Sequence, residues 1–165
     1  MKQSMPSLDL WLREAKQDPS APLCGMYLAH NGTVRQTARA RVIALFGCGG
    51  DRDHEKRPIM GEIGGRLADY CILTSDNPRT ENPQVILAAI EKGIKPTGGK
   101  YEVIENRRAA IDRALRMAEE GDVIVLAGKG HETYQEIMGI KRPFDEKVIV
   151  SELLLEIRKE KENGI

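Results

Sequence analysis

The sequence VIVLA at residues 123–127 runs directly into GKGHE at residues 128–132, and these two segments decide the fold. An unbroken apolar run rich in valine and isoleucine predicts a strand that is covered on both faces. The run VIALF at residues 42–46 has the same form and ends in the glycine-rich loop GCGG at residues 47–50. Buried strands that each end in a polar loop are typical of an α/β domain with a mainly parallel sheet.

Helical patterns lie between the strands. The clearest covers residues 105–120, where apolar side chains recur at helical spacing and Gly121 is placed as a C-terminal cap. Asn82 as N-cap and Pro83 in the first turn predict a second helix, which Gly93 would close.

Two more helices complete the pattern. One should begin near Pro58 and place Met60, Ile63 and Leu67 on one face, although the neighbouring glycines weaken it. The last should begin near Asp145. With short strands at about residues 70–73 and 101–104, the expected fold is a three-layer, Rossmann-like sheet with helices on both faces.

Residues 1–41 do not show this alternation of buried strands and helices. Ser7 could cap a short helix, and the Asn31-Gly32 pair predicts a β-hairpin because it tolerates the positive φ angles of a type I′ turn. We therefore expect two parts: a helix-plus-hairpin appendage of different origin at residues 1–41, and the α/β domain at residues 42–161.

The composition excludes several classes of function. Lys and Arg (25) balance Asp and Glu (25), so no overall field favours nucleic acid or an acidic membrane surface. No apolar run approaches the about 18 residues of a membrane span. The three cysteines form no CxxC pair, which argues against a disulfide framework or a zinc site. A reducing cytoplasm is the expected location.

Three polar clusters each follow a predicted strand, at residues 47–57, 76–79 and 128–132. The carboxyl ends of parallel strands share one edge of a sheet, where ligands usually bind. In these clusters Arg52 and Arg79 are cations suited to a carboxylate, and the amide of Asn77 can both donate and accept hydrogen bonds. Glu132 can accept hydrogen bonds from an ammonium group, so the set would suit a zwitterionic amino acid. Polar turns with solvated charges remain the simpler alternative.

Two nucleotide-binding motifs are imitated and fail. The loop at residues 47–50 lacks the last glycine of G-x-G-x-x-G, because Arg52 stands there. Gly128-Lys129-Gly130 resembles part of a Walker A motif, but Gly130 replaces the required Ser or Thr and Val123 the required Gly. None of the three histidines sits beside a Ser or Cys nucleophile, so we predict no catalytic residue and no metal ligand.

Four segments, taken in order, resemble the C-terminal domain of the Mur ligases that add meso-diaminopimelate to a UDP-linked muramyl dipeptide. They are GCGGDRD at residues 47–53, KRP at 56–58, DNPR at 76–79 and GKGHE at 128–132. The resemblance covers about residues 42–155. It implies a part in peptidoglycan synthesis, in a reaction that uses ATP and Mg²⁺ to phosphorylate the γ-carboxyl of D-glutamate before an amine attacks it.

The resemblance also implies roles for individual residues. Asn77 and Arg79 would hold the distal carboxylate of diaminopimelate, Gly128 and Glu132 would surround its distal amine, and Arg52 would hold substrate from the first loop. Lysine lacks that carboxylate, so an unpaired guanidinium at Arg79 should disfavour it. The complete set of expected substrate-binding residues is Arg52, Asp76, Asn77, Arg79, Gly128 and Glu132.

The UDP-binding and ATPase domains of that family are not found in this sequence. We therefore expect a fragment that is inactive alone, binds no ATP or Mg²⁺ itself, and meets the UDP-MurNAc-dipeptide only with the missing domains. Residues 1–40 resemble instead the opening of proteins related to the large subunit of molybdopterin synthase. Two alternatives thus stay open: a stand-alone module that binds diaminopimelate or muropeptides, and a protein of molybdenum-cofactor biosynthesis.

Overall fold

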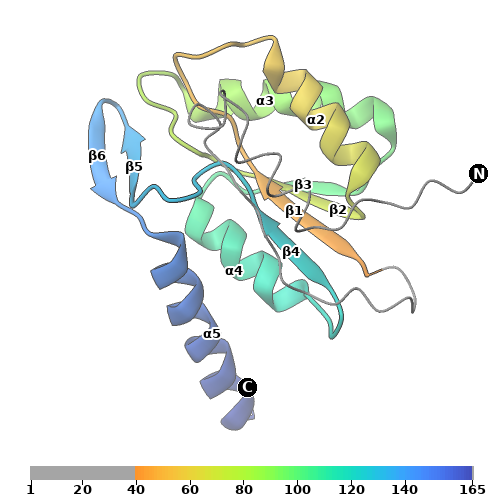
Figure 1. Cartoon of the computed structure of the whole chain (residues 1–165), viewed down its shortest axis with the longest axis vertical. Coiled ribbons are helices and arrows are strands. Elements are labelled where there is room, and N and C mark those ends of the chain that lie inside the picture. The colour runs from red at the N-terminus through yellow and green to blue at the C-terminus, as the bar shows by residue number, and fades with distance from the viewer. Residues whose placement is uncertain (1–39, 165) are drawn as a thin grey trace, which may run out of the picture. The chain divides into compact units, whose positions relative to one another are not determined.

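A parallel sheet forms the centre of the computed structural model, which describes residues 40–164 of the chain (Figure 1). Its strands are β1 (Val42–Phe46), β2 (Tyr70–Leu73), β3 (Tyr101–Val103) and β4 (Val123–Leu126). They lie in the order β3-β2-β1-β4, and every pairing among them is parallel. The Rossmann-like α/β fold expected from the sequence is confirmed.

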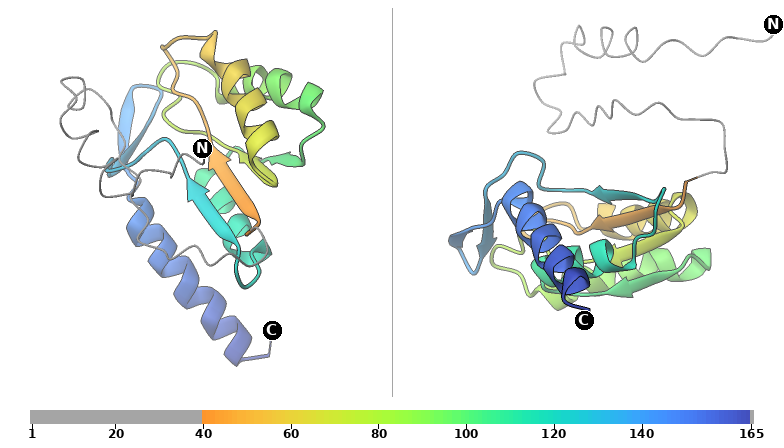
Figure 2. Two further views of the ribbon diagram at one scale, coloured as in Figure 1. Left: turned by 45° about the vertical axis from the view of Figure 1, so that its right-hand side comes forward. Right: turned by 90° about the horizontal axis from the view of Figure 1, so that it is seen from below.

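Helices cover both faces of this sheet, as the two views in Figure 2 show. They are α2 (Lys56–Leu67), α3 (Pro83–Ile94), which continues into a 3₁₀ turn at Lys95–Thr97, α4 (Arg107–Met117) and α5 (Glu146–Glu162). Neighbouring residues of one strand point to opposite faces, so Ile72 packs on the α4 side while Cys71 and Leu73 pack on the α3 side. Apolar side chains on both faces bury the sheet from two sides.

The helix starts follow the caps in the sequence. The side-chain oxygen of Asn82 accepts a hydrogen bond from the backbone N–H of Gln84 at 2.9 Å, and that of Asp145 accepts one from Lys147 at 2.9 Å. The helix ends differ from expectation. Gly93 lies inside α3 and does not close it, and α4 ends at Met117, before Gly121.

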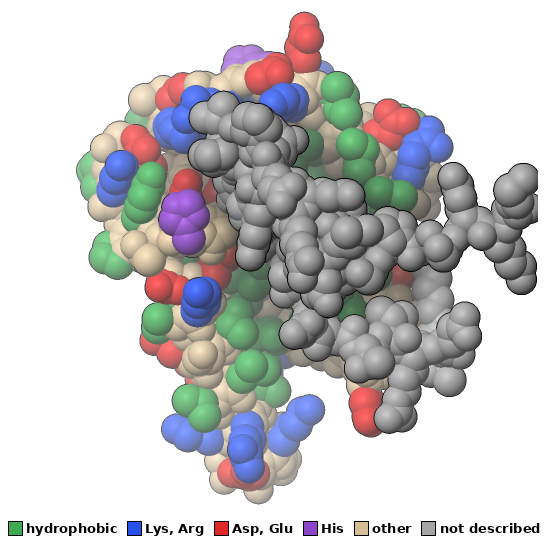
Figure 3. Space-filling view, viewed as in Figure 1, with side chains coloured by type: hydrophobic (Ala, Val, Ile, Leu, Met, Phe, Trp, Pro, Cys, Tyr) green, Lys and Arg blue, Asp and Glu red, His purple; other side chains and the backbone are tan. Residues whose placement is uncertain are grey.

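The packing face of α2 differs from the predicted one. Met60, Ile63 and Leu67 share a face, but they are 37%, 51% and 70% exposed, and apolar side chains are visible over α2 in Figure 3. The helix packs through its glycines instead: a Cβ on Gly61 would stand 2.1 Å from the carbonyl oxygen of Ile90. A third glycine of α2, besides Gly64 and Gly65 that were expected to weaken it, therefore lets the helix approach α3 closely.

A two-stranded antiparallel ribbon, absent from the expectations, joins β4 to α5. It consists of β5 (Tyr134–Ile137) and β6 (Ile140–Pro143). Met138 and Gly139 connect the strands with positive φ angles of 51° and 72°, as a type I′ turn requires. The ribbon also touches the loop after β2, where Arg79 forms an isolated parallel bridge with Ile137.

The expected helix and hairpin at residues 1–41 lie almost wholly outside the described residues, so the proposed division near residue 41 stays a prediction. Within residues 40–164, no helix combines the length and the apolar character that crossing a membrane would require.

Candidate functional site

Three loops leave the carboxyl ends of the parallel strands: the first loop (residues 47–55, after β1), the second loop (74–82, after β2) and the third loop (127–133, after β4). Hydrogen bonds tie them together. The backbone N–H of Gly50 donates to the carbonyl of Asn77 at 2.8 Å, and the Asn77 side chain donates to Glu132 at 2.7 Å. The structure thus brings the three predicted polar clusters to one edge of the sheet.

Two glycines allow the first two loops to touch. A Cβ on Gly47 would stand 2.0 Å from the carbonyl oxygen of Thr74, and one on Gly50 would stand 1.9 Å from that of Pro78. Both distances lie far inside contact range, and the obstructing atoms belong to the backbone. The glycine-rich loop therefore serves close backbone packing, in agreement with the rejection of a dinucleotide motif.

Lys129 is the centre of the polar network, although no role was predicted for it. Its side chain is fully buried, and Nζ donates to Asn77 Oδ1 at 2.9 Å and to the Tyr134 carbonyl at 2.8 Å. Two carboxylates also face it, Asp76 at 3.4 Å and Glu132 at 3.6 Å. These partners offset the cost of burying the Lys129 side chain.

Asn77 is held from both ends of its amide. Its Oδ1 also accepts a hydrogen bond from the backbone N–H of Glu136 at 2.9 Å, while Nδ2 donates to Glu132. The residue is 4% exposed. Asn77 therefore joins the second loop to the third loop and to β5 around Lys129, and it fixes the orientation of the Glu132 carboxylate.

Arg79 and Arg52 both lie close to Gly49. A Cβ at Gly49 would come within 2.8 Å of Arg79 Nη1 and 3.5 Å of Arg52 Cγ. Arg79 donates from Nη1 to the carbonyl of Gly50 at 2.6 Å, and its side chain is 24% exposed. Arg52 is exposed. One arginine with a fixed guanidinium and an exposed second arginine nearby suit the capture of a carboxylate.

Glu132 and Gly128 form the other part of the site. The Glu132 side chain is 33% exposed and uses Oε2 for its contacts with Asn77 and Lys129. Gly128 has a φ of 116°, a conformation that side-chain-bearing residues rarely adopt, and lies against Asp76. A partly exposed carboxylate beside a bare backbone segment offers acceptors for an ammonium group.

A further ion pair links the first and second loops. Buried Arg57 donates from both terminal nitrogens to Glu81, at 2.9 and 2.8 Å. The backbone N–H of Asp51 also donates to Glu81. The Arg57 guanidinium, followed by the Asp51 N–H, lowers the pKa of Glu81 to about 2. This pair had no assigned role in the sequence, because its partners lie 24 positions apart.

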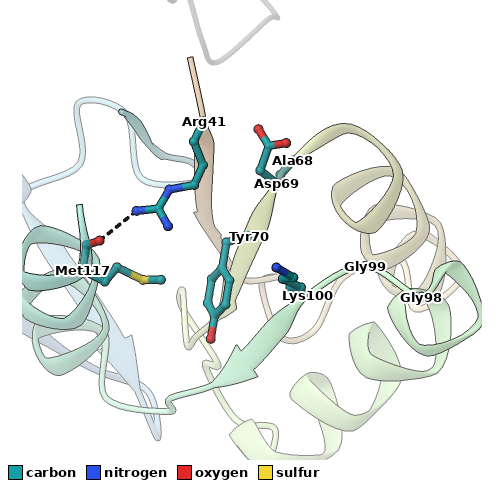
Figure 4. Close-up of a pocket in the computed structure, with 8 residues that line it drawn as sticks. All are labelled: Arg41, Ala68, Asp69, Tyr70, Gly98, Gly99, Lys100 and Met117. Atoms are coloured by element: carbon teal, nitrogen blue, oxygen red, sulfur yellow. Dashed lines mark hydrogen bonds between the residues drawn. The ribbon is translucent and has the colours of Figure 1, made fainter. Parts of the chain in front are cut away.

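A hollow of about 700 Å³ lies elsewhere, at the amino ends of the strands (Figure 4). Arg41, Asp69, Tyr70 and Lys100 are among its lining residues. Arg41 turns toward the carbonyl of Met117 and pairs with Asp122, while Asp69 accepts a hydrogen bond from the backbone of Val42. These side chains hold the edge of the fold together, and ligands of open α/β sheets bind at the other end of the strands.

Among residues 40–164, no group of three or more His, Cys, Asp and Glu side chains has an arrangement that could hold a metal ion. His131 is exposed, and His54 lies 3.3 Å from Glu81. The site thus consists of groups that bind and orient, with cations at one part and a carboxylate at another.

Fold and site together define an α/β domain of the Rossmann-like class with a polar network at the carboxyl edge of its parallel sheet. Comparison with known families places it further: the model described as "Mur ligase, glutamate ligase domain" matches residues 29–130. The chain belongs to the Mur ligase family.

Curated relatives agree with this assignment. The chain is 58% identical over 126 residues to a UDP-N-acetylmuramoyl-L-alanyl-D-glutamate–2,6-diaminopimelate ligase of Caldanaerobacter subterraneus, covering 76% of this chain and 26% of that protein. It is 56% identical over 124 residues to ligase 1 of the same name from Clostridium acetobutylicum, covering 74% and 25%. The chain thus spans about a quarter of the length of these relatives.

A solved structure gives the same picture. The structure of a UDP-N-acetylmuramoyl-L-alanyl-D-glutamate–2,6-diaminopimelate ligase matches with a TM-score of 0.68 and 46% sequence identity. The match covers 72% of this chain and 24% of that one. The resemblance expected from the four sequence segments is confirmed.

Proposed function

We propose that the described domain recognises meso-diaminopimelate for an ATP-dependent, amide-bond-forming ligase of peptidoglycan precursor synthesis, and that it does not turn over alone. The names of the relatives support this substrate. The relatives are about four times as long as the part of this chain that matches them, since the match covers 26% and 25% of their length. We therefore assign the binding sites for ATP, Mg²⁺ and the UDP-linked dipeptide to segments outside these residues. We place the reaction in the cytoplasm.

The roles of the side chains follow from their chemistry. Arg79 binds the distal carboxylate of the amino acid, because its guanidinium is held in place by the Gly50 carbonyl at 2.6 Å. Arg52, which is exposed, adds a second cation from the first loop. Glu132 and the backbone at Gly128 accept hydrogen bonds from the distal ammonium group. Asp76 and Asn77 act through Lys129, as positioning residues.

The observation that carries the proposal is the Lys129 network. Its partners Asn77, Asp76, Glu132 and the Tyr134 carbonyl all belong to this domain. The orientation of Glu132 therefore needs no contribution from another domain. We expect the isolated chain to bind the amino acid in the absence of ATP and of the other domains.

Selectivity against lysine follows from the same arrangement. Lysine has no distal carboxylate, so it would leave the Arg79 guanidinium, 24% exposed, with only the Gly50 carbonyl and Glu136, whose Oε2 lies 3.9 Å from Arg79 Nε. A hydrogen bond to a charged group is typically worth about 1.5–3 kcal/mol, which is roughly 10- to 150-fold in affinity. Diaminopimelate should therefore bind at least several-fold more tightly than lysine.

Calorimetric titration of the full chain tests the proposal without ATP. Meso-diaminopimelate should bind saturably, whereas L-lysine and the Arg79→Ala variant should show at least about tenfold weaker binding. Arg66→Ala is the matched control, since Arg66 is an exposed arginine on α2 that pairs only with Glu62 in the described structure. Absence of binding by a chain shown to be folded, or equal loss in both variants, would overturn the proposal.

A further inference from the structure

A second cavity of about 400 Å³ lies beside the second loop, with Ser75 and Pro78 of that loop among its lining residues. Its walls come from three places: Ser75 of the second loop, the start of α4 at Asn106, Arg107 and Arg108, and the β5–β6 ribbon at Gln135 and Arg142. None of the residues assigned above to amino-acid recognition lines it. The cavity therefore needs an explanation of its own.

Two buried polar atoms of this wall lack partners. Ser75 is 9% exposed and Arg107 is 1% exposed, yet Ser75 Oγ and Arg107 Nη1 have no hydrogen-bond partner among the described residues. The rest of Arg107 is fixed, because Nε donates to Glu146 at 2.7 Å and Nη2 to the Ala127 carbonyl at 2.9 Å. Buried polar groups in folded proteins almost always have a partner. A guanidinium can only donate, so the missing partner must be an acceptor.

The charges around the cavity favour an anion. Arg107, Arg108 and Arg142 line it, against one carboxylate, Glu105, which accepts a hydrogen bond from Gln84. Glu146 neutralises Arg107, and Glu152 pairs with Arg108 at 2.7 Å. Arg142 has no ion pair within residues 40–164 and lies exposed on β6. One cation at the rim thus remains available to a ligand.

Helix α4 adds to this preference. It begins at the cavity, with Asn106 as its N-cap, and carries no acidic residue in its first turn. The N–H groups of a first helical turn and the positive end of the helix dipole favour oxyanions. An oxyanion there would accept hydrogen bonds from Ser75 Oγ and Arg107 Nη1, the two atoms that lack partners.

We propose that this cavity, formed by Ser75, the start of α4 and Arg142, binds a phosphate group. Inorganic phosphate is smaller than the volume of about 400 Å³, which also accommodates a phosphate monoester. This site does not depend on the function proposed above, because the two share no ligand-binding residue. They share the second loop, however: an occupied phosphate site would restrain Ser75 and Pro78, and the same loop carries Asn77 and Arg79.

Titration of the full chain with inorganic phosphate tests the site, and the binding is measured by calorimetry and by backbone amide chemical shifts. Saturable binding should shift the amide signals of Ser75, Asn106 and Arg107. Ser75→Ala and Arg142→Gln should each weaken binding by about 3- to 10-fold, as expected for the loss of one hydrogen bond or one rim charge. Arg158→Gln is the matched control, since Arg158 is 78% exposed on α5 and does not line the cavity.

Glycerol phosphate distinguishes the two sources of the phosphate group. Tighter binding than inorganic phosphate would support a monoester as the ligand, and equal or weaker binding would support free phosphate. The proposal is overturned if phosphate does not saturate the chain, if the affected amides lie elsewhere, or if Ser75→Ala binds like the parent chain. Binding of meso-diaminopimelate, measured in parallel, keeps a failure here separate from a failure of the amino-acid site.

Discussion

Lys129 Nζ donates a hydrogen bond of 2.9 Å to Asn77 Oδ1, and so joins two loops whose residues lie 52 positions apart. This bond places a fully buried cation beneath the polar edge of the sheet. Since Asn77 also donates to Glu132, the same contact determines the direction of the carboxylate that faces solvent. The proposed binding geometry and the stability of the domain should therefore depend on one buried group.

Replacing Lys129 with methionine should destabilise the domain strongly. The change leaves Asp76 and Glu132 without the cation that faces them at 3.4 and 3.6 Å. Removing one partner of a buried ion pair typically costs about 3–5 kcal/mol. Urea unfolding measures the loss, with Lys92→Met as control, because Lys92 is exposed on α3. Equal unfolding free energies for the two variants would contradict the role of Lys129.

Glu132→Gln should affect binding more than folding. The amide oxygen of glutamine can still accept the hydrogen bond from Asn77, so we expect the unfolding free energy to change by less than about 1 kcal/mol. The negative charge is lost, and affinity for meso-diaminopimelate should fall by about tenfold. Calorimetry of both chains checks this prediction. Unchanged affinity would remove Glu132 from the proposed ammonium site.

The ion pair between Arg57 and Glu81 predicts a pH dependence. The pKa of Glu81 is lowered from 4.5 to about 2, mainly by the Arg57 side chain. A lowered carboxyl pKa stabilises the fold fully above the unfolded value, and this contribution is lost as the pH falls toward the folded value. The stability difference between the parent chain and Glu81→Gln should therefore be constant near neutral pH and shrink between about pH 4.5 and pH 2.

Urea unfolding of both chains from pH 7 downward measures this difference. Asp112→Asn is a useful comparison, since Asp112 is a carboxylate paired with Arg116 within one helix. A difference between the parent chain and Glu81→Gln that does not change with pH would show that the Glu81 carboxyl is not held ionised by Arg57.

Gly61→Ala provides a test in which two principles predict opposite signs. Helix propensity alone predicts a gain of about 1 kcal/mol in the interior of α2. The new Cβ would stand 2.1 Å from the Ile90 carbonyl oxygen, so α2 and α3 would have to separate. We expect a net loss of about 1–3 kcal/mol. Thermal unfolding checks the sign, with Glu62→Ala at the next, exposed position as control.

The same glycine shows where sequence patterns fail. The apolar spacing of Met60, Ile63 and Leu67 marks a real helix face, but pattern alone cannot show that the opposite face packs through glycine. The strands at residues 42–46 and 123–126 were predictable because both runs are uniformly apolar. The expectation that residues 123–127 are covered on both faces was wrong, because β4 is the edge strand and is exposed at Val123 and half-buried elsewhere. Asn82 and Asp145 were predictable as helix starts because capping is a local interaction.

The parts of the site that could not be predicted depend on contacts between distant segments. Lys129 reads as an ordinary loop lysine until the loop that carries Asn77 folds over it. The β5–β6 ribbon is short and half-exposed or exposed along its length, so it lacks the apolar run that marked the sheet strands. Only the Met138-Gly139 turn offered a local signal for it, through the glycine at its second position.

The glycine contact between α2 and α3 has a mechanical consequence for choosing among ligands. Arg57 at the start of α2 donates two hydrogen bonds to Glu81, just before α3. The first and second loops are therefore both anchored on the packed pair of helices α2 and α3. Arg52 and Arg79 belong to those loops, and Glu132 is tied to the same body through Asn77. The proposed pocket would then hold its carboxylate-binding and ammonium-binding groups at a fixed distance and so select an amino acid by its length. A diamino diacid one methylene shorter or longer than diaminopimelate would not match this distance.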